Sequence, residues 1–290
     1  MNDKSKKQYM SNSRIDNSIR YIPIDGTKFP VAPYGSKQKI NINISLAYKN
    51  DDNVSISKSV SFFEKIVADA VYSLYEEERE VFTINDVARL VYGEGTDPSL
   101  KQTEDLKKAI DKLRHIDVTI DASEEDSKKS LKYINYLLPV KSVEATFGSA
   151  AVTAFKFMDQ PPIFAYAKAH NQVVIVDRIW LDTASCFRDT EEIVKIRYYI
   201  VHRILTMKNS NNNVRSNVIS YDRIDDDGTR KGLYALADLN MDSFSNIRRK
   251  RMEINKIVQK LLEYYKSKRL IEDFQFVKEN QKIVGVKINA

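Results

Sequence analysis

Residues 242–270 most constrain what this chain can fold into, because they combine an apolar stripe with a dense run of cations. The apolar side chains recur at spacings of three, four or seven, at Ile247, Ile254, Val258, Leu261 and Tyr265. This spacing predicts a long helix with one buried face. The cations are consecutive and fall in its first turns: Arg248, Arg249, Lys250 and Arg251.

Four like charges at the start of a helix oppose its macrodipole, which favours anions there. An anionic partner would offset that cost, and a basic helix start above an apolar underside is typical of a helix in a DNA major groove. We expect Asn246, Arg248 and Arg249 near base edges, because Arg pairs with guanine and Asn with adenine. We expect Arg251 and Lys256 nearer phosphates, with Lys250 completing the cluster. A solvated surface helix remains the alternative.

Composition indicates a globular protein. The chain has 290 residues, of which 42% are hydrophobic and 30% charged, which is enough for two domains with their own cores. The net charge of +6 and a pI of about 9.0 permit nucleic-acid binding without establishing it.

No apolar run approaches the roughly 20 residues that span a bilayer, and no apolar segment follows the polar N-terminus. We therefore expect no membrane association and a cytoplasmic location. Cys186, the single cysteine, excludes an intramolecular disulfide and a cysteine-based zinc site.

The first half of the chain is predicted to hold helices followed by a β-hairpin. Ser61 and Glu64 have the spacing of a capping box, Thr83 is the expected N-cap of a second helix, and Gly93 its terminator. The expected elements are an N-terminal arm (1–50) with an edge strand (39–48), helices at 57–78, 83–93 and 103–115, and strands at 116–120 and 131–138. This order is typical of a winged-helix domain, with the hairpin as the wing.

Further strands are predicted at 143–147, 152–157 and 173–176, with turns at Pro161-Pro162 and Asn171-Gln172. They extend the first domain (51–183) and are suited to a dimer surface. The second domain (184–290) repeats the plan, with elements expected at 191–207, 218–219, 233–239, 242–270, 274–278 and 283–288. The predicted fold is therefore α+β, with two tandem winged-helix domains, the first extended by additional β-strands.

Weaker candidates for DNA contact lie outside the basic helix. Lys278 and Lys282 fall in the second hairpin, where a solvated surface is the alternative. Lys107, Lys108 and Lys112 are expected on the outward side of the helix at 103–115, although neighbouring acidic residues dilute this face.

Two stretches carry a resemblance to a known family: PPIFAYAKAHNQVVIVDRIWLD (161–182) and KIRYYIVHRILTMKNSNNN (195–213). Together with the helix and hairpin order, over roughly residues 55–289, the chain resembles plasmid replication initiators of the Rep type. The resemblance implies binding to repeated origin sequences, with the C-terminal domain dominating DNA contact. It also implies a dimer-to-monomer switch through the first domain and recruitment of the host initiator and helicase. The acidic stretches at 124–126 and 225–227 depart from a uniformly basic DNA face.

The predicted function is sequence-specific binding of double-stranded DNA at origin repeats, to initiate replication of a plasmid or mobile element. A transcriptional repressor or partition-type regulator is the alternative, because it needs the same groove contacts. A nicking enzyme would need paired histidines to hold a metal, whereas His115, His170 and His202 lie far apart in sequence. The acidic loop at 225–228 is interpreted as a solvated turn. We expect no cofactor, no metal and no catalytic activity.

Overall fold

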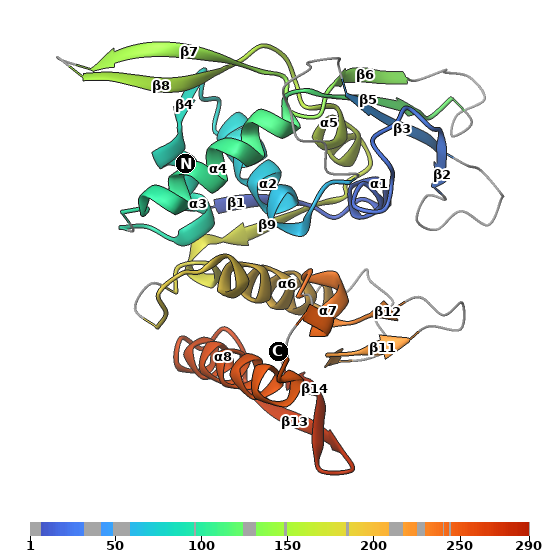
Figure 1. Ribbon diagram of the computed structural model, residues 1–290, viewed down its shortest axis with the longest axis vertical. Coiled ribbons are helices and arrows are strands. Elements are labelled where there is room, and N and C mark those ends of the chain that lie inside the picture. The colour runs from blue at the N-terminus through green and yellow to red at the C-terminus, as the bar shows by residue number, and fades with distance from the viewer. Residues whose placement is uncertain are drawn as a thin grey trace. The chain divides into compact units, whose positions relative to one another are not determined.

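The computed structural model describes residues 7–31, 42–48, 59–95, 97–123, 132–147, 150–183, 186–208, 217–224, 230–239, 241–243 and 245–289. The chain divides into two compact units (Figure 1). Unit 1 comprises residues 1–91 and 97–176, and unit 2 comprises residues 92–96 and 177–290. Both combine helices with antiparallel sheets, so the fold is of mixed α and β type.

The elements of unit 1 alternate between short strands and helices. In chain order they are β1 (Lys7–Ser11), α1 (Arg14–Ser18), β2 (Phe29–Val31), β3 (Ile42–Tyr48), α2 (Phe62–Glu76), β4 (Val81–Thr83), α3 (Ile84–Tyr92), α4 (Leu100–Leu113), β5 (Ile116–Asp121), β6 (Lys132–Tyr136), β7 (Val140–Phe147), β8 (Ala150–Phe157), α5 (Pro162–Ala169) and β9 (Val173–Asp177).

Local capping explains where the helices of unit 1 begin. The predicted capping box of α2 is confirmed, with Ser61 N–H donating to Glu64 Oε2 at 2.7 Å and Glu64 N–H donating to Ser61 Oγ at 3.2 Å. Thr83 caps α3 by accepting from Asp86 N–H at 3.3 Å. Helix α4 begins at Leu100, earlier than predicted, because Ser99 forms a further capping box with the residue three positions on. Such boxes satisfy backbone N–H groups that the first turn leaves unpaired.

The predicted pairing of the strands at 116–120 and 131–138 is confirmed, because β5 and β6 are antiparallel neighbours. They were expected to stand alone as a wing hairpin, but β5 pairs on its other edge with β3, in the sheet β2-β3-β5-β6. β3 is therefore an inner strand and not the predicted edge strand. The hairpin that returns to β4, the strand between α2 and α3, is β7–β8, in the sheet β4-β8-β7.

Helix α5 was not predicted, because Pro161-Pro162 was interpreted as a turn. Pro162 is instead the first residue of the helix, where its missing N–H would have no intrahelical partner. Ile163, Phe164, Tyr166 and Ala167 are buried, which is the spacing of one helical face. The predicted turn at 171–172 is consistent with Asn171, whose φ of 54° lies in the left-handed region.

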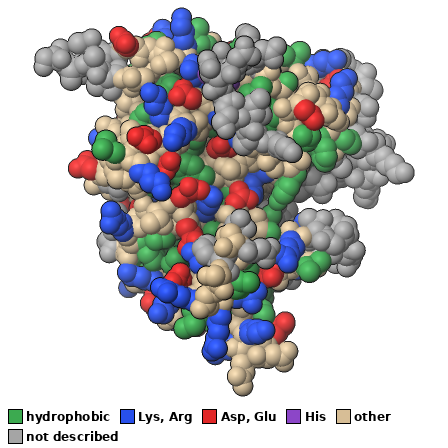
Figure 2. Space-filling view, viewed as in Figure 1, with side chains coloured by type: hydrophobic (Ala, Val, Ile, Leu, Met, Phe, Trp, Pro, Cys, Tyr) green, Lys and Arg blue, Asp and Glu red, His purple; other side chains and the backbone are tan. Residues whose placement is uncertain are grey.

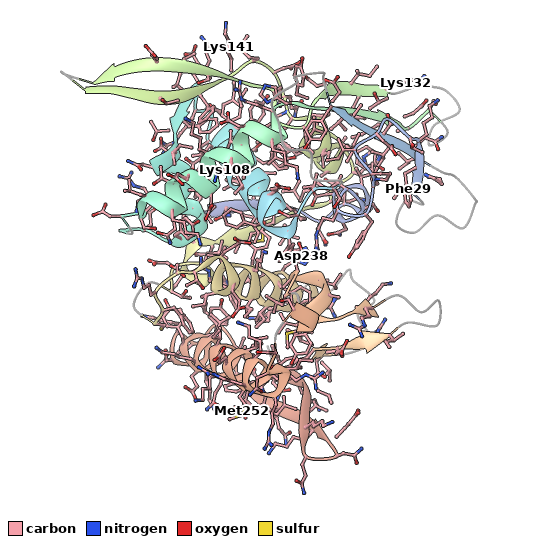
Figure 3. All side chains as sticks on the ribbon, viewed as in Figure 1. Phe29, Lys108, Lys132, Lys141, Asp238 and Met252 are labelled. Carbon is pink, nitrogen blue, oxygen red and sulfur yellow. The ribbon has the colours of Figure 1, made fainter. Side chains whose placement is uncertain are left out.

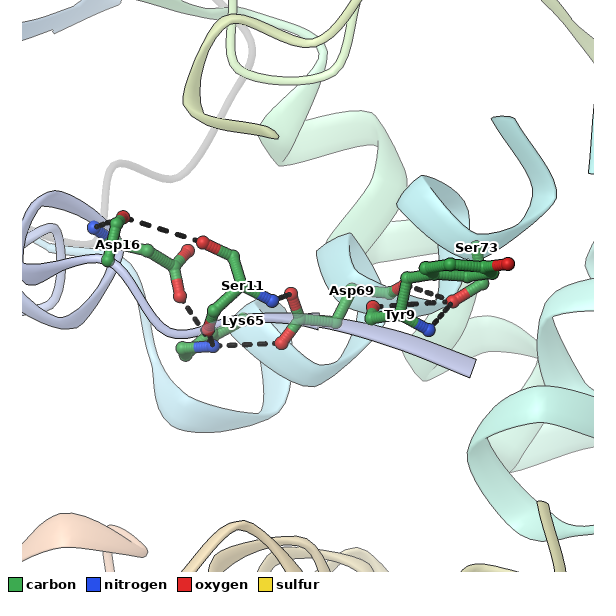
Figure 4. A network of polar contacts seen from close by, with 7 residues as sticks. Tyr9, Ser11, Asp16, Lys65, Asp69 and Ser73 are labelled. Atoms are coloured by element: carbon green, nitrogen blue, oxygen red, sulfur yellow. Dashed lines mark hydrogen bonds and ion pairs between the residues drawn. The ribbon is translucent and has the colours of Figure 1, made fainter. Parts of the chain in front are cut away.

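The described N-terminal residues pack onto α2 through a buried polar network (Figure 4). Lys65 of α2 lies between two carboxylates, with its Nζ 2.6 Å from Asp16 Oδ2 and 2.8 Å from Asp69 Oδ2. The side chains of Asp16 and Asp69 are fully buried and that of Lys65 is nearly so. Asp69 also accepts a hydrogen bond from the Ser11 N–H at 3.0 Å. The network therefore fastens β1 and α1 to α2.

Charge balance in this network affects protonation. Burial raises the pKa of Asp16 to about 7, although the Lys65 ammonium acts in the opposite direction. Burial of Lys65 disfavours its charge, but the carboxylates of Asp16 and Asp69 outweigh this and raise its pKa above the ordinary value. One lysine cannot neutralise two carboxylates, so a proton on Asp16 leaves the three groups electrically balanced.

We expect the stability of unit 1 to depend on pH through Asp16. Between its ordinary pKa of 3.8 and about 7, the folded chain holds a proton on Asp16 that the unfolded chain has released. Stability from this group therefore falls as pH rises through that window, by up to about 1.4 kcal/mol per pH unit. Urea unfolding at pH 5 and pH 7.5 checks this, with Asp16→Asn as the comparison. The difference between wild type and variant should change with pH; a constant difference would contradict the raised pKa.

Unit 2 resembles part of unit 1 in the order of its elements, although each unit has a strand pair that the other lacks. After a short 3-10 turn (Arg178–Trp180) it contains α6 (Glu191–Lys208), β10 (Val218–Ser220), β11 (Arg223–Ile224), β12 (Arg230–Lys231), α7 (Leu233–Leu236), a 3-10 turn (Met241–Ser243), α8 (Ile247–Ser267), β13 (Asp273–Glu279) and β14 (Lys282–Asn289). The sheet order is β10-β14-β13, so the strand after the first helix pairs with the last strand, as β4 pairs with β8 in unit 1.

The predicted hairpin at the end of the chain is confirmed as β13–β14. Glu279 and Lys282 are register partners across a two-residue turn. The turn residues Asn280 and Gln281 both have positive φ, 47° and 66°, which is the geometry that matches the twist of paired strands.

The core of unit 2 holds α8 by its apolar side. Ile254, Val258, Leu261 and Tyr265 are buried as predicted. Ile247 was expected in the same stripe but is 39% exposed, because it is the first residue of the helix. The Tyr265 hydroxyl donates to the Trp180 carbonyl at 2.8 Å, and the two rings are 5.0 Å apart. These contacts fix which side of α8 faces outward.

Candidate nucleic-acid interface

The start of α8 is organised by Asn246, which is its N-cap. The Asn246 side-chain oxygen accepts from the Arg249 N–H at 2.9 Å. Asn246 is exposed, so its amide group is accessible to a partner. Bidentate pairing with adenine uses both amide atoms; Asn246 would have to release this cap to pair in that way.

The run of four cations divides into an outward and an inward pair. Successive residues of an α-helix are turned by roughly 100°, so four consecutive side chains cannot share one side. Arg248 and Arg249 are exposed, whereas Lys250 and Arg251 are half-buried. Of the four cations, only Arg248 and Arg249 are therefore accessible for the expected base contacts.

The side chains of the outward pair, Arg248 and Arg249, have few bonds to the rest of the protein. Within the described part of the chain, Arg248 makes no side-chain hydrogen bond or ion pair. Arg249 Nε lies 3.2 Å from Glu253 Oε1, and the two side chains are 79% and 47% exposed. An exposed pair at this spacing contributes about 0.3–0.5 kcal/mol, so a phosphate or a base edge can replace Glu253 at little cost.

The inward pair, Lys250 and Arg251, is half-buried against the rest of unit 2. Lys250 Nζ lies 2.5 Å from Glu192 Oε2 of α6, and its side chain is 13% exposed. Arg251 borders a hollow of about 340 Å³ together with Tyr234 and Ile247. Burial raises the pKa of Tyr234 to about 12, although the Arg251 charge opposes this shift. Lys250 therefore links the start of α8 to α6, and a direct DNA contact by Lys250 or Arg251 remains a prediction.

The outward surface continues along α8. Met252 and Lys256 are exposed, and Met252 points away from the core of unit 2 (Figure 3). We call Arg248, Arg249, Met252 and Lys256 the outer face of α8. Figure 2 shows Lys and Arg side chains exposed over this part of unit 2, with Asp and Glu side chains between them. Sequence reasoning missed Met252; the signal was its spacing of three or four residues from Arg248, Arg249 and Lys256.

The hairpin candidates are accessible. Lys278 and Lys282 are both exposed near the turn between β13 and β14. Lys282 lies opposite Glu279 in the register, which partly offsets its charge. Their contact with a phosphate backbone stays a prediction.

In unit 1, α4 presents only two of its three expected cations. Lys107 and Lys108 are exposed, and Lys108 lies on the visible side of α4 in Figure 3. Lys112 was expected outward, which is wrong, because it is only 8% exposed. Its Nζ donates to the Ser59 carbonyl at 2.7 Å and lies 2.6 Å from Glu64 Oε2. Lys112 therefore joins α4 to the capped start of α2.

The acidic stretches at 124–126 and 225–227 lie outside the described residues. The described histidines belong to different elements: His115 follows α4, His170 follows α5, and His202 lies in α6. Across the described ranges, no group of three or more His, Cys, Asp and Glu side chains is placed to hold a metal ion. Nor does any helix in those ranges have the length and apolar character needed to cross a membrane.

Comparison with known proteins finds similar solved structures but no family. No family model matches the sequence, and no curated protein matches it. Two solved structures are similar over most of the chain. A crystal structure of a selenomethionine derivative of domains 2 and 3 of RctB has a TM-score of 0.44 and 14% identity, covering 96% of this chain and 96% of that one. Another, of RctB domains 2–3 (155–483), has a TM-score of 0.42 and 14% identity, covering 94% and 97%.

Proposed function

We propose that this chain is a sequence-specific double-stranded DNA-binding protein that initiates replication of a plasmid or similar mobile element by binding origin repeats. The outer face of α8 carries the proposal. It exposes Arg248, Arg249 and Lys256 on a helix whose opposite side is buried in the core of unit 2. A helix with its side chains is about 10–12 Å wide, close to the roughly 12 Å of the major groove.

We propose further that both units are winged helices. In unit 1, α2, β4, α3 and α4 are followed, after β5 and β6, by the hairpin β7–β8, whose strand β8 pairs with β4. In unit 2, α6 and β10 are followed, after the short pair β11–β12, by α7, α8 and the hairpin β13–β14, whose strand β14 pairs with β10. In both units a helix with an exposed polar side is followed later in the chain by such a hairpin, and winged helices use a helix and a hairpin together on DNA. The proposed wings are β7–β8 in unit 1 and β13–β14 in unit 2, with α4 and α8 as the recognition helices.

Initiation of replication is preferred over other uses of DNA binding for two reasons. The stretches 161–182 and 195–213 resemble Rep-type initiators. Two units with a related order of elements also suit repeated target sequences. In the proposed mechanism the cations displace counterions from phosphates, and recognition helices enter major grooves. Assembly on the repeats then assists opening of adjacent AT-rich DNA and recruitment of the host initiator and helicase. A change between dimer and monomer is part of this proposal, and no bond is made or broken.

We expect affinity for duplex DNA to fall steeply with salt. Each phosphate contact releases counterions, which lowers log K by about 0.9 per unit of log salt concentration. Fluorescence anisotropy with a labelled duplex, titrated at several salt concentrations, gives the slope. Contacts by Arg248, Arg249, Lys256 and the hairpin lysines predict a slope of several units. An affinity that does not change with salt would contradict this interface.

The role in replication is tested separately from binding. Nuclease protection on the parent replicon locates the bound repeats, and a plasmid that carries only this region is supplied with the protein in trans. Maintenance of that plasmid is the expected result. Binding with repression of a linked promoter, but without maintenance, would identify a regulator.

Supercoiled DNA incubated with the protein and magnesium should remain unnicked; a nicked product would identify an enzyme.

A further inference from the structure

Met252 is an apolar side chain at the centre of a cationic surface. It is 54% exposed, and on a helix its neighbours are the residues three and four positions away. Three of these are Arg248, Arg249 and Lys256, all exposed. If these cations contact DNA, Met252 is held against the part of the DNA that lies between the groups they contact.

Isolated apolar side chains on a surface are common and need no partner. The position of Met252 is more specific, because the cations around it determine the chemistry of the partner. Arg248 and Lys256 are separated by about two helical turns, and Met252 lies midway between them. If both cations contact duplex DNA, Met252 therefore faces the floor of the major groove. The apolar group that a major groove offers there is the C5 methyl of thymine.

We propose that Met252 contacts the C5 methyl of a thymine in the major groove and is a specificity-determining residue of this protein. The proposal rests on the DNA-binding function proposed above. One helical turn advances about 5.4 Å and one base pair about 3.4 Å. The thymine is therefore expected within about two base pairs of the base contacted by Arg248 or Arg249.

The test uses the full chain and duplexes carrying the protected sequence, in which each thymine in turn is replaced by uracil. Uracil lacks only the methyl group. At one position, uracil should weaken binding of the wild type about fourfold, as expected for one buried methyl-sized group. Met252→Ala should weaken binding to the thymine duplex to a similar extent and lose the difference between thymine and uracil at that position.

Arg248→Ala is the matched control. It should weaken binding to the thymine and uracil duplexes alike and preserve their ratio. If the protein does not bind duplex DNA at all, the proposed function fails and the inference with it. If it binds but no thymine is sensitive, or Met252→Ala keeps the full thymine preference, only the role of Met252 is overturned. Because Met252 is exposed, thermal unfolding of Met252→Ala should match wild type, which separates a lost contact from a damaged fold.

Discussion

Replacing Arg248 and Arg249 together by alanine is expected to reduce affinity for the specific duplex by at least about 30-fold. Each well-placed arginine contributes about 1–3 kcal/mol of discrimination at a base pair, and a tenfold change in affinity is about 1.4 kcal/mol. Both side chains are exposed, and the ion pair between Arg249 and Glu253 is a surface contact. Stability should therefore change by no more than about 0.5 kcal/mol. Anisotropy titrations and urea unfolding measure the two effects.

Two matched variants show what the arginines contribute. Arg248→Lys with Arg249→Lys keeps both charges but loses the planar donors that pair with guanine. It should keep most of the salt dependence and lose preference for the specific sequence. Arg188→Ala with Lys268→Ala removes the same charge from exposed positions of unit 2 outside the outer face of α8 and the hairpin β13–β14, and this variant should bind nearly as wild type. Unchanged affinity of the double alanine variant at Arg248 and Arg249 would remove α8 from the interface.

The sequence predicts the existence and the buried side of α8 better than it predicts which of its Lys and Arg side chains point outward. The apolar spacing at Ile254, Val258 and Leu261 is local information, and it predicts the buried side of α8 correctly. Whether Lys250 points inward depends on Glu192 in another helix, and no local pattern contains that contact. Lys112 is a second case, because its partner Glu64 is 48 positions away in the chain.

The same distinction applies to the strands. The strands β5 and β6, and likewise β7 and β8, are neighbours in the chain, so either pair can be interpreted from the sequence as a hairpin. Pairing of β8 with β4 and of β5 with β3 is determined by packing between distant segments. Hairpins are thus predictable where turn residues are local, whereas their place in a sheet is not.

The buried network of unit 1 was also not predicted, because Lys65 falls within the apolar pattern of α2 as an ordinary polar residue. Replacing Lys65 by methionine is expected to lower the free energy of unfolding by about 3–5 kcal/mol. The change leaves Asp16 and Asp69 buried without their cation, and removing one partner of a buried ion pair has a cost of this size. Both carboxyl groups are inaccessible, so water cannot replace the ammonium. Urea unfolding at pH 7.5 measures the loss.

The triple variant Lys65→Met, Asp16→Asn, Asp69→Asn separates lost charge balance from lost packing. Without buried charges, the hydrophobic stem of methionine can occupy the space of the lysine chain, and replacement of a whole buried ionic group is often close to neutral. We therefore expect the triple variant to recover much of the stability that the single variant loses. The Ser11 N–H donates to Asp69 in the wild type, and the asparagine oxygen can still accept that bond. If the triple variant is as unstable as Lys65→Met, packing of the lysine chain, and not its charge, holds the N-terminal segment on α2.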